Sequence, residues 1–280
     1  MSATAVTTLR TASPLPALRN RAPLVAGALL VVLLLGAVLA PLVAPYAMDA
    51  LDLANRRASP SAQHWFGTDE LGRDLLTRVL FGARVSLAIG LISALVSAAV
   101  GAAVGAVAGS AGRVADDVLM RITDAMLAIP RLPLLMIAAA VLQPSVPLLV
   151  LLVGLAGWME TARVVRAEVQ SLAARDFVSA ARAIGASPVR VLLRHVLPGV
   201  LPAIAVATTL AVGRGILLES ALSFFGVGVQ PPTASWGNML YQAQTTMTSE
   251  PWLAIFPGAM IFVTVLACNA VGDAIGEQRS

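Results

Sequence analysis

The sequence predicts an all-α membrane protein with six transmembrane helices. Of the 280 residues, 58% are hydrophobic and only 12% are charged, whereas an ordinary soluble domain carries about 25% charged residues. A helix needs about 20 apolar residues to cross the hydrocarbon core of a bilayer. Stretches of about that length or longer lie near residues 24–43, 85–108, 118–142, 146–165, 200–225 and 252–271.

The first apolar stretch follows a basic segment, residues 1–22, which carries Arg10, Arg19 and Arg21 and no acid. A cleaved signal peptide has a shorter apolar core of about 7–15 residues. We therefore expect residues 23–44 to form a retained first transmembrane helix, with residues 1–22 as a cytoplasmic tail.

Arginine positions predict the orientation, because short cytoplasmic loops carry an excess of basic residues. If the N-terminus is cytoplasmic, most arginines fall in cytoplasmic segments, whereas residues 143–145 and 227–250 contain no basic residue. Four arginines remain outside in the loop at 45–83, accompanied by five acids, and Arg84 follows directly after the loop. We expect both termini in the cytoplasm, the second being the tail 274–280.

The loop at 45–83 contains "GTDELGRDLLTRVL", residues 67–80. Thr68 or Asp69 can cap a helix there, and Asp74 and Arg78 have the spacing of an i, i+4 pair. Leucines and a valine form an apolar stripe in the same stretch. We expect an amphipathic helix on the outer membrane face, before the second span.

The third apolar stretch begins with charged residues, Asp116, Asp117, Arg121 and Asp124, which we expect at the membrane interface. Pro130 and Pro133 follow within it. A proline removes a helix hydrogen bond and is tolerated inside a membrane bundle, so the two prolines predict a kink.

The longest cytoplasmic loop, residues 171–198, is expected to fold as two short amphipathic helices. Gly185 allows a backbone conformation closed to most residues, and Ser187-Pro188 suits a helix cap and first position. Apolar residues recur at helical spacing on both sides of this break. Two interpretations remain open from the pattern alone: an interfacial pair that places its arginines at lipid headgroups, or a docking element.

This loop resembles the conserved "EAA" loop of the inner-membrane permeases of ABC importers. Five residues match that pattern at its spacing: Ala180, Ala181, Gly185, Leu197 and Pro198. Ser179 stands where the pattern has glutamate, and His195 where it has isoleucine. The resemblance implies that Ala180, Ala181 and Gly185, with the Ser187-Pro188 turn, form a surface that docks into an ATPase subunit, and that Leu197-Pro198 returns the chain to the membrane.

Two further stretches, "HWFGTDELGRDLLTRVLFGARVSL" at 64–87 and "ESALSFFGVGVQPPTASWGNML" at 219–240, resemble the second permease of dipeptide, oligopeptide and nickel importers. The resemblance implies the type I ABC-importer permease fold, with residues 84–273 as the core. Peptide is the implied cargo and nickel the alternative. The implied partners are a homologous permease, two ATPase subunits or domains, an external binding protein and membrane lipid, with no nucleic acid. The helix at 67–80 is then either purely structural or a contact for the substrate-delivery protein.

Energy for transport is expected from a partner and not from this chain. A phosphate-binding loop requires the lysine of G-x-x-x-x-G-K-[ST], and the sequence contains no lysine. We therefore expect a transport subunit that is not an enzyme and holds no cofactor.

Two other classes of membrane protein predict different sequence features. An ion-coupled secondary transporter predicts inverted repeats and intramembrane acids, but no internal repeat is clear and we expect Glu219 to be the only acid deep in a span. An intramembrane hydrolase needs a nucleophile beside a base, yet neither His64 nor His195 lies in a predicted span. These histidines and Cys268 are scattered, so no metal site is predicted.

Arg214 and Glu219 lie in the fifth predicted span. Ionisable groups at membrane depth are costly and usually face a bundle interior or a watery cavity. Five residues apart on a helix, the two side chains do not share a face. Each is expected either to pair across helices or to line a transport path.

Overall fold

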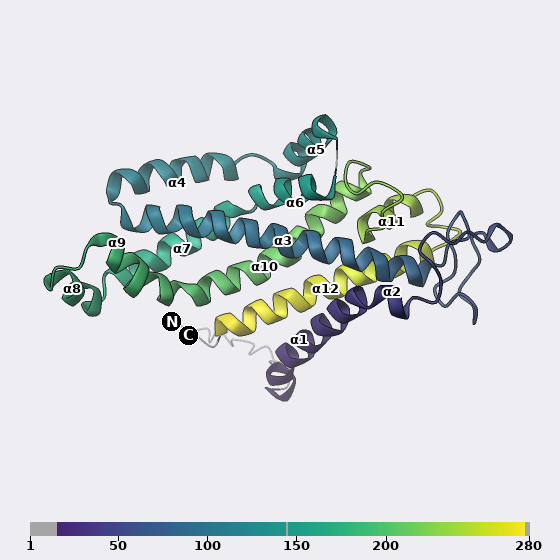
Figure 1. Cartoon of the computed structure of the whole chain (residues 1–280), viewed down its shortest axis with the longest axis horizontal. Helices are drawn as coiled ribbons and strands as arrows, with labels where there is room; N and C mark the ends of the chain where they lie inside the picture. The colour runs from purple at the N-terminus through teal and green to yellow at the C-terminus, as the bar shows by residue number, and fades with distance from the viewer. Residues whose placement is uncertain (1–15, 144, 278–280) are drawn as a thin grey trace, which may run out of the picture.

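The computed structural model describes residues 16–143 and 145–277, and their regular elements are all helices. The long helices α3, α10 and α12 lie along one common direction (Figure 1). The α-helices are α1 (Pro16–Val38), α2 (Ala40–Val43), α3 (Leu75–Ser110), α4 (Arg113–Leu127), α5 (Arg131–Leu142), α6 (Val146–Leu155), α7 (Trp158–Ala173), α8 (Asp176–Ala183), α9 (Pro188–Val191), α10 (Leu197–Phe224), α11 (Trp236–Ala243) and α12 (Trp252–Glu277). A 3₁₀ turn, η1, spans Leu53–Asn55, and a π-helical turn, η2, spans Leu192–Val196.

Three helices of the described residues are long and apolar enough to cross a membrane: Leu75–Ser110, Pro188–Phe224 and Trp252–Glu277. Two bent pairs raise the number to five if each counts as one span. These are α4 with α5, bent by 80°, and α6 with α7, bent by 41°. The apolar part of α1, Pro23–Val38, is shorter than these. Length and composition thus support a multi-helix membrane protein, and the predicted count of six is not reached by this criterion.

The helix predicted at 67–80 is not a separate element: residues 67–74 are not helical, and residues 75–80 form the first turns of α3. Asp74, and neither Thr68 nor Asp69, is the N-cap, with its carboxylate accepting from the backbone N–H of Thr77 at 2.8 Å. The predicted Asp74–Arg78 pair is also wrong: Arg78 pairs with Asp69, with Nε to Oδ2 at 3.5 Å. A carboxylate that caps its own helix points back to the first turn and is not free for a residue four positions on.

The apolar stripe at the start of α3 packs inside the protein. Leu75 is 2% exposed and Val79 is fully buried, against Met239 of α11 and Leu253 of α12. The apolar stripe, which was expected to lie on the outer membrane face, is therefore covered by α11 and α12 of the same chain.

The predicted kink in the third apolar stretch is confirmed. Helix α4 ends at Leu127, Pro130 precedes α5, and the two helix axes differ by 80°. Two of the charges at the start of this stretch have partners on α7: Asp116 pairs with Arg166, and Asp124 pairs with Arg163. These ion pairs hold α4 against α7.

Glycines on α3 allow α7 to pack at close range. A Cβ added at Gly101 would lie 2.6 Å from the Thr161 Cβ, and one at Gly105 would lie 2.5 Å from the Ala162 carbonyl oxygen. Small residues four positions apart are a common means of close helix packing in membranes. Helix α3 therefore forms the centre of the bundle, with α7 on one side and α10 on another.

Candidate functional site

The segment at 171–198, which we call the coupling segment, contains the turn that the sequence predicted. Helix α8 ends at Ala183 and Gly185 has φ of +86°, in the left-handed region. The backbone N–H of Gly185 donates to the Arg182 carbonyl at 3.0 Å. Ser187 then caps α9 by accepting from the Arg190 N–H at 3.4 Å, with Pro188 at the first helical position. The predicted roles of Gly185, Ser187 and Pro188 in the turn are confirmed.

One face of the coupling segment packs on the chain itself. Val178 is fully buried, Ala181 is 5% exposed and Val191 is 2% exposed. They form one cluster with Val165 and Val169 of α7. Ala181, which the resemblance placed on the docking surface, therefore packs its methyl group inside this chain.

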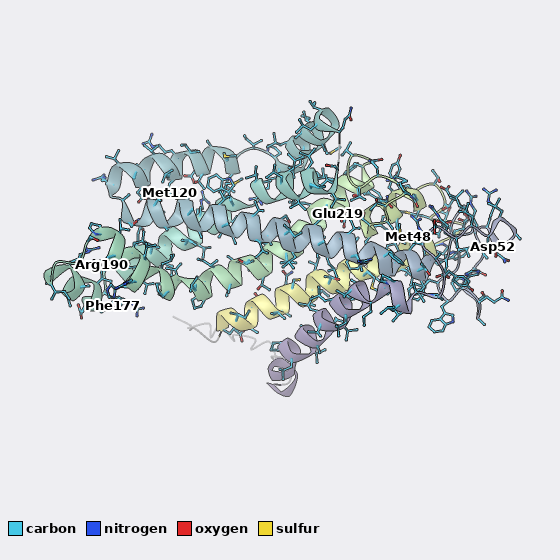
Figure 2. The ribbon with its side chains drawn as sticks, in the orientation of Figure 1. Met48, Asp52, Met120, Phe177, Arg190 and Glu219 are labelled. Atoms are coloured by element: carbon cyan, nitrogen blue, oxygen red, sulfur yellow. The ribbon has the colours of Figure 1, made fainter. Side chains whose placement is uncertain are left out.

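The opposite face of the coupling segment exposes large apolar side chains. Ile184 is 87% exposed, Val189 66%, Leu193 55% and Phe177 45%. Ala180, Gly185, Ser187 and Pro188 are exposed beside them. We call Phe177, Ile184, Val189 and Leu193 the apolar face. Helices α8 and α9 lie at one end of the molecule, where Phe177 and Arg190 are labelled (Figure 2).

The helix that leads from the coupling segment back to the bundle continues through Leu197 and Pro198. Residues 188–224 run as one long helix, α9, η2 and α10. Proline has no N–H, and its ring collides with the carbonyl four residues earlier in a regular α-helix. The π-helical turn at Leu192–Val196 relieves this locally, with the Leu197 N–H donating to the Leu192 carbonyl.

Arg214 pairs across helices, as one of the two predicted alternatives has it. Its guanidinium contacts Glu160 of α7, and the same carboxylate accepts from Arg131 Nη2 of α5 at 2.7 Å. Glu160 and Arg131 are not among the site residues predicted from the sequence, and Glu219 is not the only acid within a predicted span. Glu160 stands inside the apolar stretch at 146–165, and its position there was the signal that could have revealed it.

Glu219 is fully buried and makes a different set of contacts. Ser86 of α3 donates to Glu219 Oε2 at 3.0 Å, and Ser223 donates to Oε1 at 2.7 Å. The two serines in turn accept from backbone N–H groups, Ser86 from Trp236 at 3.1 Å and Ser223 from Val229 at 3.0 Å. Glu219 therefore joins α3 and α10 to the segment that enters α11, in the half of the molecule that leads to the end opposite α8 (Figure 2). Arg214 pairs with Glu160 and not with Glu219, as their five-residue spacing on one helix predicted.

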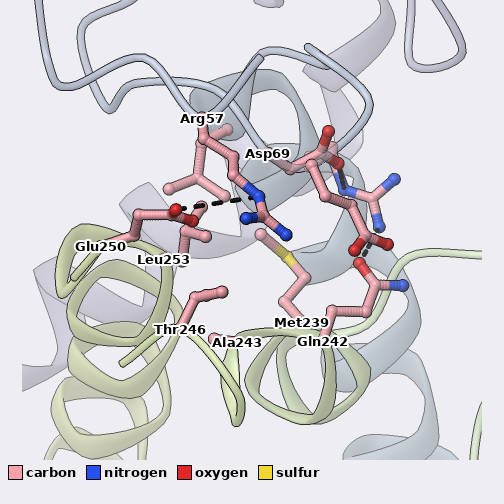
Figure 3. A pocket seen from close by; sticks show the side chains of 11 residues that line it. Arg57, Asp69, Met239, Gln242, Ala243, Thr246, Glu250 and Leu253 are labelled. Atoms are coloured by element: carbon pink, nitrogen blue, oxygen red, sulfur yellow. Dashed lines mark hydrogen bonds and ion pairs between the residues drawn. The ribbon is translucent and has the colours of Figure 1, made fainter. Parts of the chain in front are cut away.

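A polar cluster lies at that same end, between the loop at 44–74 and α11 (Figure 3). Arg57 Nε lies 3.7 Å from Glu250 Oε1, and Arg78 Nη2 donates to Gln242 Oε1 at 3.2 Å. Arg78 also pairs with Asp69. The cavity between these side chains has a volume of about 20 Å³, so it holds no more than a water-sized group.

The two histidines and the cysteine lie in separate places. His64, expected in a loop, is 7% exposed, with Nδ1 at 3.0 Å from Asp74 Oδ1. His195 lies exposed on η2, and Cys268 is buried in α12. Within residues 16–143 and 145–277, no three His, Cys, Asp or Glu side chains are grouped as metal ligands.

Comparison with known proteins covers nearly the whole chain. A family model described as binding-protein-dependent transport system inner membrane component matches residues 101–278. A second, the N-terminal TM domain of oligopeptide transport permease C, matches residues 18–60.

Curated relatives match along most of their own length as well. A protein of Brucella suis biovar 1 that is named as a peptide permease is 39% identical over 262 residues, which is 93% of this chain and 87% of the relative. A glutathione transport system permease protein of Shigella flexneri serotype 5b is 41% identical over 260 residues, 92% of this chain and 86% of the relative. Its counterpart in Escherichia coli O6:K15:H31 is 40% identical over the same shares. The chain therefore belongs to the family of inner membrane components of binding-protein-dependent transport systems, as an ABC-importer permease of the peptide type.

Proposed function

We propose that this chain is the permease subunit of an ATP-driven importer that passes peptides across the inner membrane, and that it receives the motion of separate ATPase subunits through the coupling segment. The observation that carries this proposal is the apolar face, four large side chains exposed around the Gly185 turn at one end of the molecule. An exposed apolar patch of this kind marks an interaction site more often than an idle surface.

The proposed topology has six spans with both termini in the cytoplasm. The spans lie within α1, α3, α4 with α5, α6 with α7, residues 188–224, and α12, and the outermost turns of these helices extend into the tails and loops. Figure 1 supports it: the first turns of α1 and the last turns of α12 point toward the end that holds α8 and α9. Residues 45–83 and 227–250 lie toward the other end, which is the outer side in this proposal. We keep residues 1–22 and 274–280 as the cytoplasmic tails and residues 84–273 as the permease core.

The coupling segment is connected to the helix bundle in two places, so a displacement of the segment would be transmitted to the bundle. Its inner face, with Val178, Ala181 and Val191, is fixed on α7, and its second half continues into α10 without a break. Force applied to the apolar face would therefore reach both α7 and α10. In this proposal Ala181 fixes the segment from inside, whereas Ala180, Gly185, Ser187 and Pro188 border the contact with the ATPase.

Peptide is the proposed cargo because the relatives carry peptide and glutathione permease names, and glutathione is itself a small peptide. The proposed assembly pairs this chain with a homologous permease subunit, two ATPase subunits or domains, and an external binding protein. The outer loop at 45–83, which the polar cluster fixes to Gln242 of α11 and to Glu250 just before α12, is the proposed contact for that binding protein.

The test compares two variants of Ile184, the most exposed residue of the apolar face. Ile184→Asp places a charge at the contact, and Ile184→Met keeps it apolar. We expect Ile184→Asp to reach the membrane at normal levels, to co-purify with less ATPase and to lose peptide uptake, while Ile184→Met behaves as wild type. If Ile184→Asp retains both ATPase and uptake, the segment does not couple the subunits.

Gly185 gives a second test at the same contact. A branched residue at φ of +86° is strained, although a Cβ at Gly185 would meet no heavy atom of the described residues within 4 Å. Gly185→Val should therefore reduce ATPase capture and uptake, and Gly185→Asn, which tolerates the left-handed region, should retain most of both. Equal behaviour of the two variants would show that the turn's conformation is not required.

A further inference from the structure

Three charged side chains meet at the breaks of the two bent helix pairs. Arg131 is the first residue of α5, directly after the 80° bend, and Glu160 is the third residue of α7, directly after the 41° bend. Arg214 reaches Glu160 from the middle of the long helix at 188–224. We call Arg131, Glu160 and Arg214 the charged triad. One carboxylate between two guanidinium groups leaves a net charge of +1.

In the proposed topology, with the outer end of the fifth span at Phe224, the charged triad lies at the depth of the hydrocarbon core. Arg214 is ten residues before the end of α10 at Phe224, which corresponds to about 15 Å along a helix axis. The core is about 30 Å thick, so the guanidinium lies near its middle. Five residues further along, Glu219 is buried in protein, whereas the triad is not.

The triad is open to its surroundings at this depth. The side chains of Arg214, Glu160 and Arg131 are 42%, 35% and 23% exposed. Charged side chains at membrane depth do not face lipid tails, and they mark watery cavities and substrate paths. An exposed arginine near the bilayer middle therefore indicates that this face of the chain borders water in the working assembly.

The arginines keep donors free for a ligand. A guanidinium has five N–H donors, and the contacts with Glu160 use one nitrogen of each arginine, Arg131 Nη2 and Arg214 Nη1. The N-terminal ends of α5 and α7 add partial positive charge at the same place. The local field therefore favours a second anion, and the planar fork of Arg214 suits a carboxylate.

A small cavity adjoins the triad. Ser93 and Ser97 of α3, Gly157, Arg131 and Arg214 line it together with apolar residues. Its volume is about 20 Å³, room for one water molecule or for the tip of one carboxylate group. The remainder of a bound molecule would have to lie outside, on the open side of the triad.

From these observations we infer that the charged triad is a carboxylate-binding site on the translocation path, which takes the C-terminal carboxylate or an acidic side chain of the passing peptide. Arg214 and Arg131 bind the carboxylate, and Glu160 holds both arginines in place and limits the charge to +1. A weak net charge suits a path, because the site must release what it binds. This inference rests on the proposed peptide cargo.

The first experiment measures the field at the triad by cysteine chemistry, in the assembled transporter with the buried native cysteine replaced, Cys268→Ala. Leu217 is 48% exposed and lies one helical turn from Arg214, a spacing at which side chains are neighbours. Leu217→Cys is treated with a sulfonate-bearing and a trimethylammonium-bearing methanethiosulfonate, and the rates are divided by those with free 2-mercaptoethanol. We expect about a tenfold preference for the sulfonate reagent, the size of effect that a nearby charge produces at reduced dielectric.

Two arginine variants test the origin of that preference. Arg214→Gln should remove it, and the matched control Arg163→Gln, which breaks the α7 pair with Asp124 outside the triad, should retain it. Absence of reaction with both reagents would mean that a partner or lipid covers this face and would overturn the inference. Reaction without charge preference would overturn it too.

The second experiment tests the ligand. N-acetyl-alanyl-alanine should slow labelling of Leu217→Cys, and its C-terminal amide should not; equal protection by both, or by neither, contradicts a carboxylate site. The labelling rates of Leu217→Cys depend neither on ATP nor on uptake. The carboxylate site can therefore be refuted without any consequence for the coupling segment. If Ile184→Asp abolishes coupling while labelling shows no charge preference, the proposed function stands and the carboxylate site does not.

Discussion

Glu219 and Arg214 are separated by five residues and have opposite surroundings. Glu219 is enclosed by serine hydroxyls that also hold the entry to α11, whereas Arg214 is open and shares Glu160 with Arg131. A buried carboxylate without partners costs several kcal/mol, so the two serine donors are what allow Glu219 to remain inside the protein. At the scale of single residues, one ionisable group stabilises the structure and the other is available for binding.

Replacement of Glu219 should therefore affect stability first. Glu219→Gln keeps one acceptor for Ser86 or Ser223 and should cost about 1–2 kcal/mol, whereas Glu219→Ala leaves both serines without this acceptor and should cost about 2–4 kcal/mol. The measurement is the Tm of the purified protein in detergent. Thr209→Val, which removes an exposed hydroxyl bonded within its own helix, is the control and should shift the Tm least. A Tm for Glu219→Ala equal to that of Thr209→Val would contradict the structural role.

At the scale of elements, the features that could be predicted from the sequence are the turns and bends that depend on residues adjacent in the chain. The turn at 185–188 was predictable because glycine, serine and proline define it locally, and Pro130 marked the bend between α4 and α5 for the same reason. The burial of Ala181 and the cap at Asp74 were not, since they depend on α7, α11 and α12, which are distant in sequence. The Arg131–Glu160–Arg214 contact needs three helices to converge, and no spacing within one helix indicates it.

The contact between α3 and α7 gives a prediction for elements. Gly101→Ala adds a methyl group 2.6 Å from the Thr161 Cβ and from the Trp158 carbonyl oxygen, so α3 and α7 must separate, at a cost of about 1–3 kcal/mol. Gly27→Ala, on α1, is the matched control because its added Cβ meets no heavy atom of the described residues within 4 Å. We expect a lower Tm and less membrane-inserted protein for Gly101→Ala only. Equal values for the two variants would mean that this helix contact is looser than the structure has it.

At the scale of the whole molecule, the two ends carry different chemistry. One end has α8, α9 and the apolar face, and the other has the polar cluster, α11 and the loop at 44–74 (Figure 1). The proposed topology assigns the first end to the cytoplasm, where an ATPase is available, and the second to the outside, where a binding protein delivers the cargo. The charged triad lies between them.

Single cysteines in the Cys268→Ala background test this assignment. Ser61→Cys, in the exposed part of the 45–83 loop, should react with a membrane-impermeant maleimide added outside intact cells, and so should Thr233→Cys. Ser187→Cys, exposed at the coupling turn, should react only after the membrane is opened. Labelling of Ser187→Cys from outside would reverse the orientation.

The most direct test of the central claim is a site-specific cross-link from the coupling segment to the ATPase. A photoreactive residue at position 184, where the native isoleucine is 87% exposed, is compared with one at position 181, where the alanine is 5% exposed. In the assembled transporter we expect illumination to join position 184 to an ATPase subunit and to leave position 181 joined only within this chain. The contrary result is that position 184 is joined to lipid alone, although the complex still contains the ATPase. That result would show that the apolar face is a membrane contact, and it would contradict the coupling role.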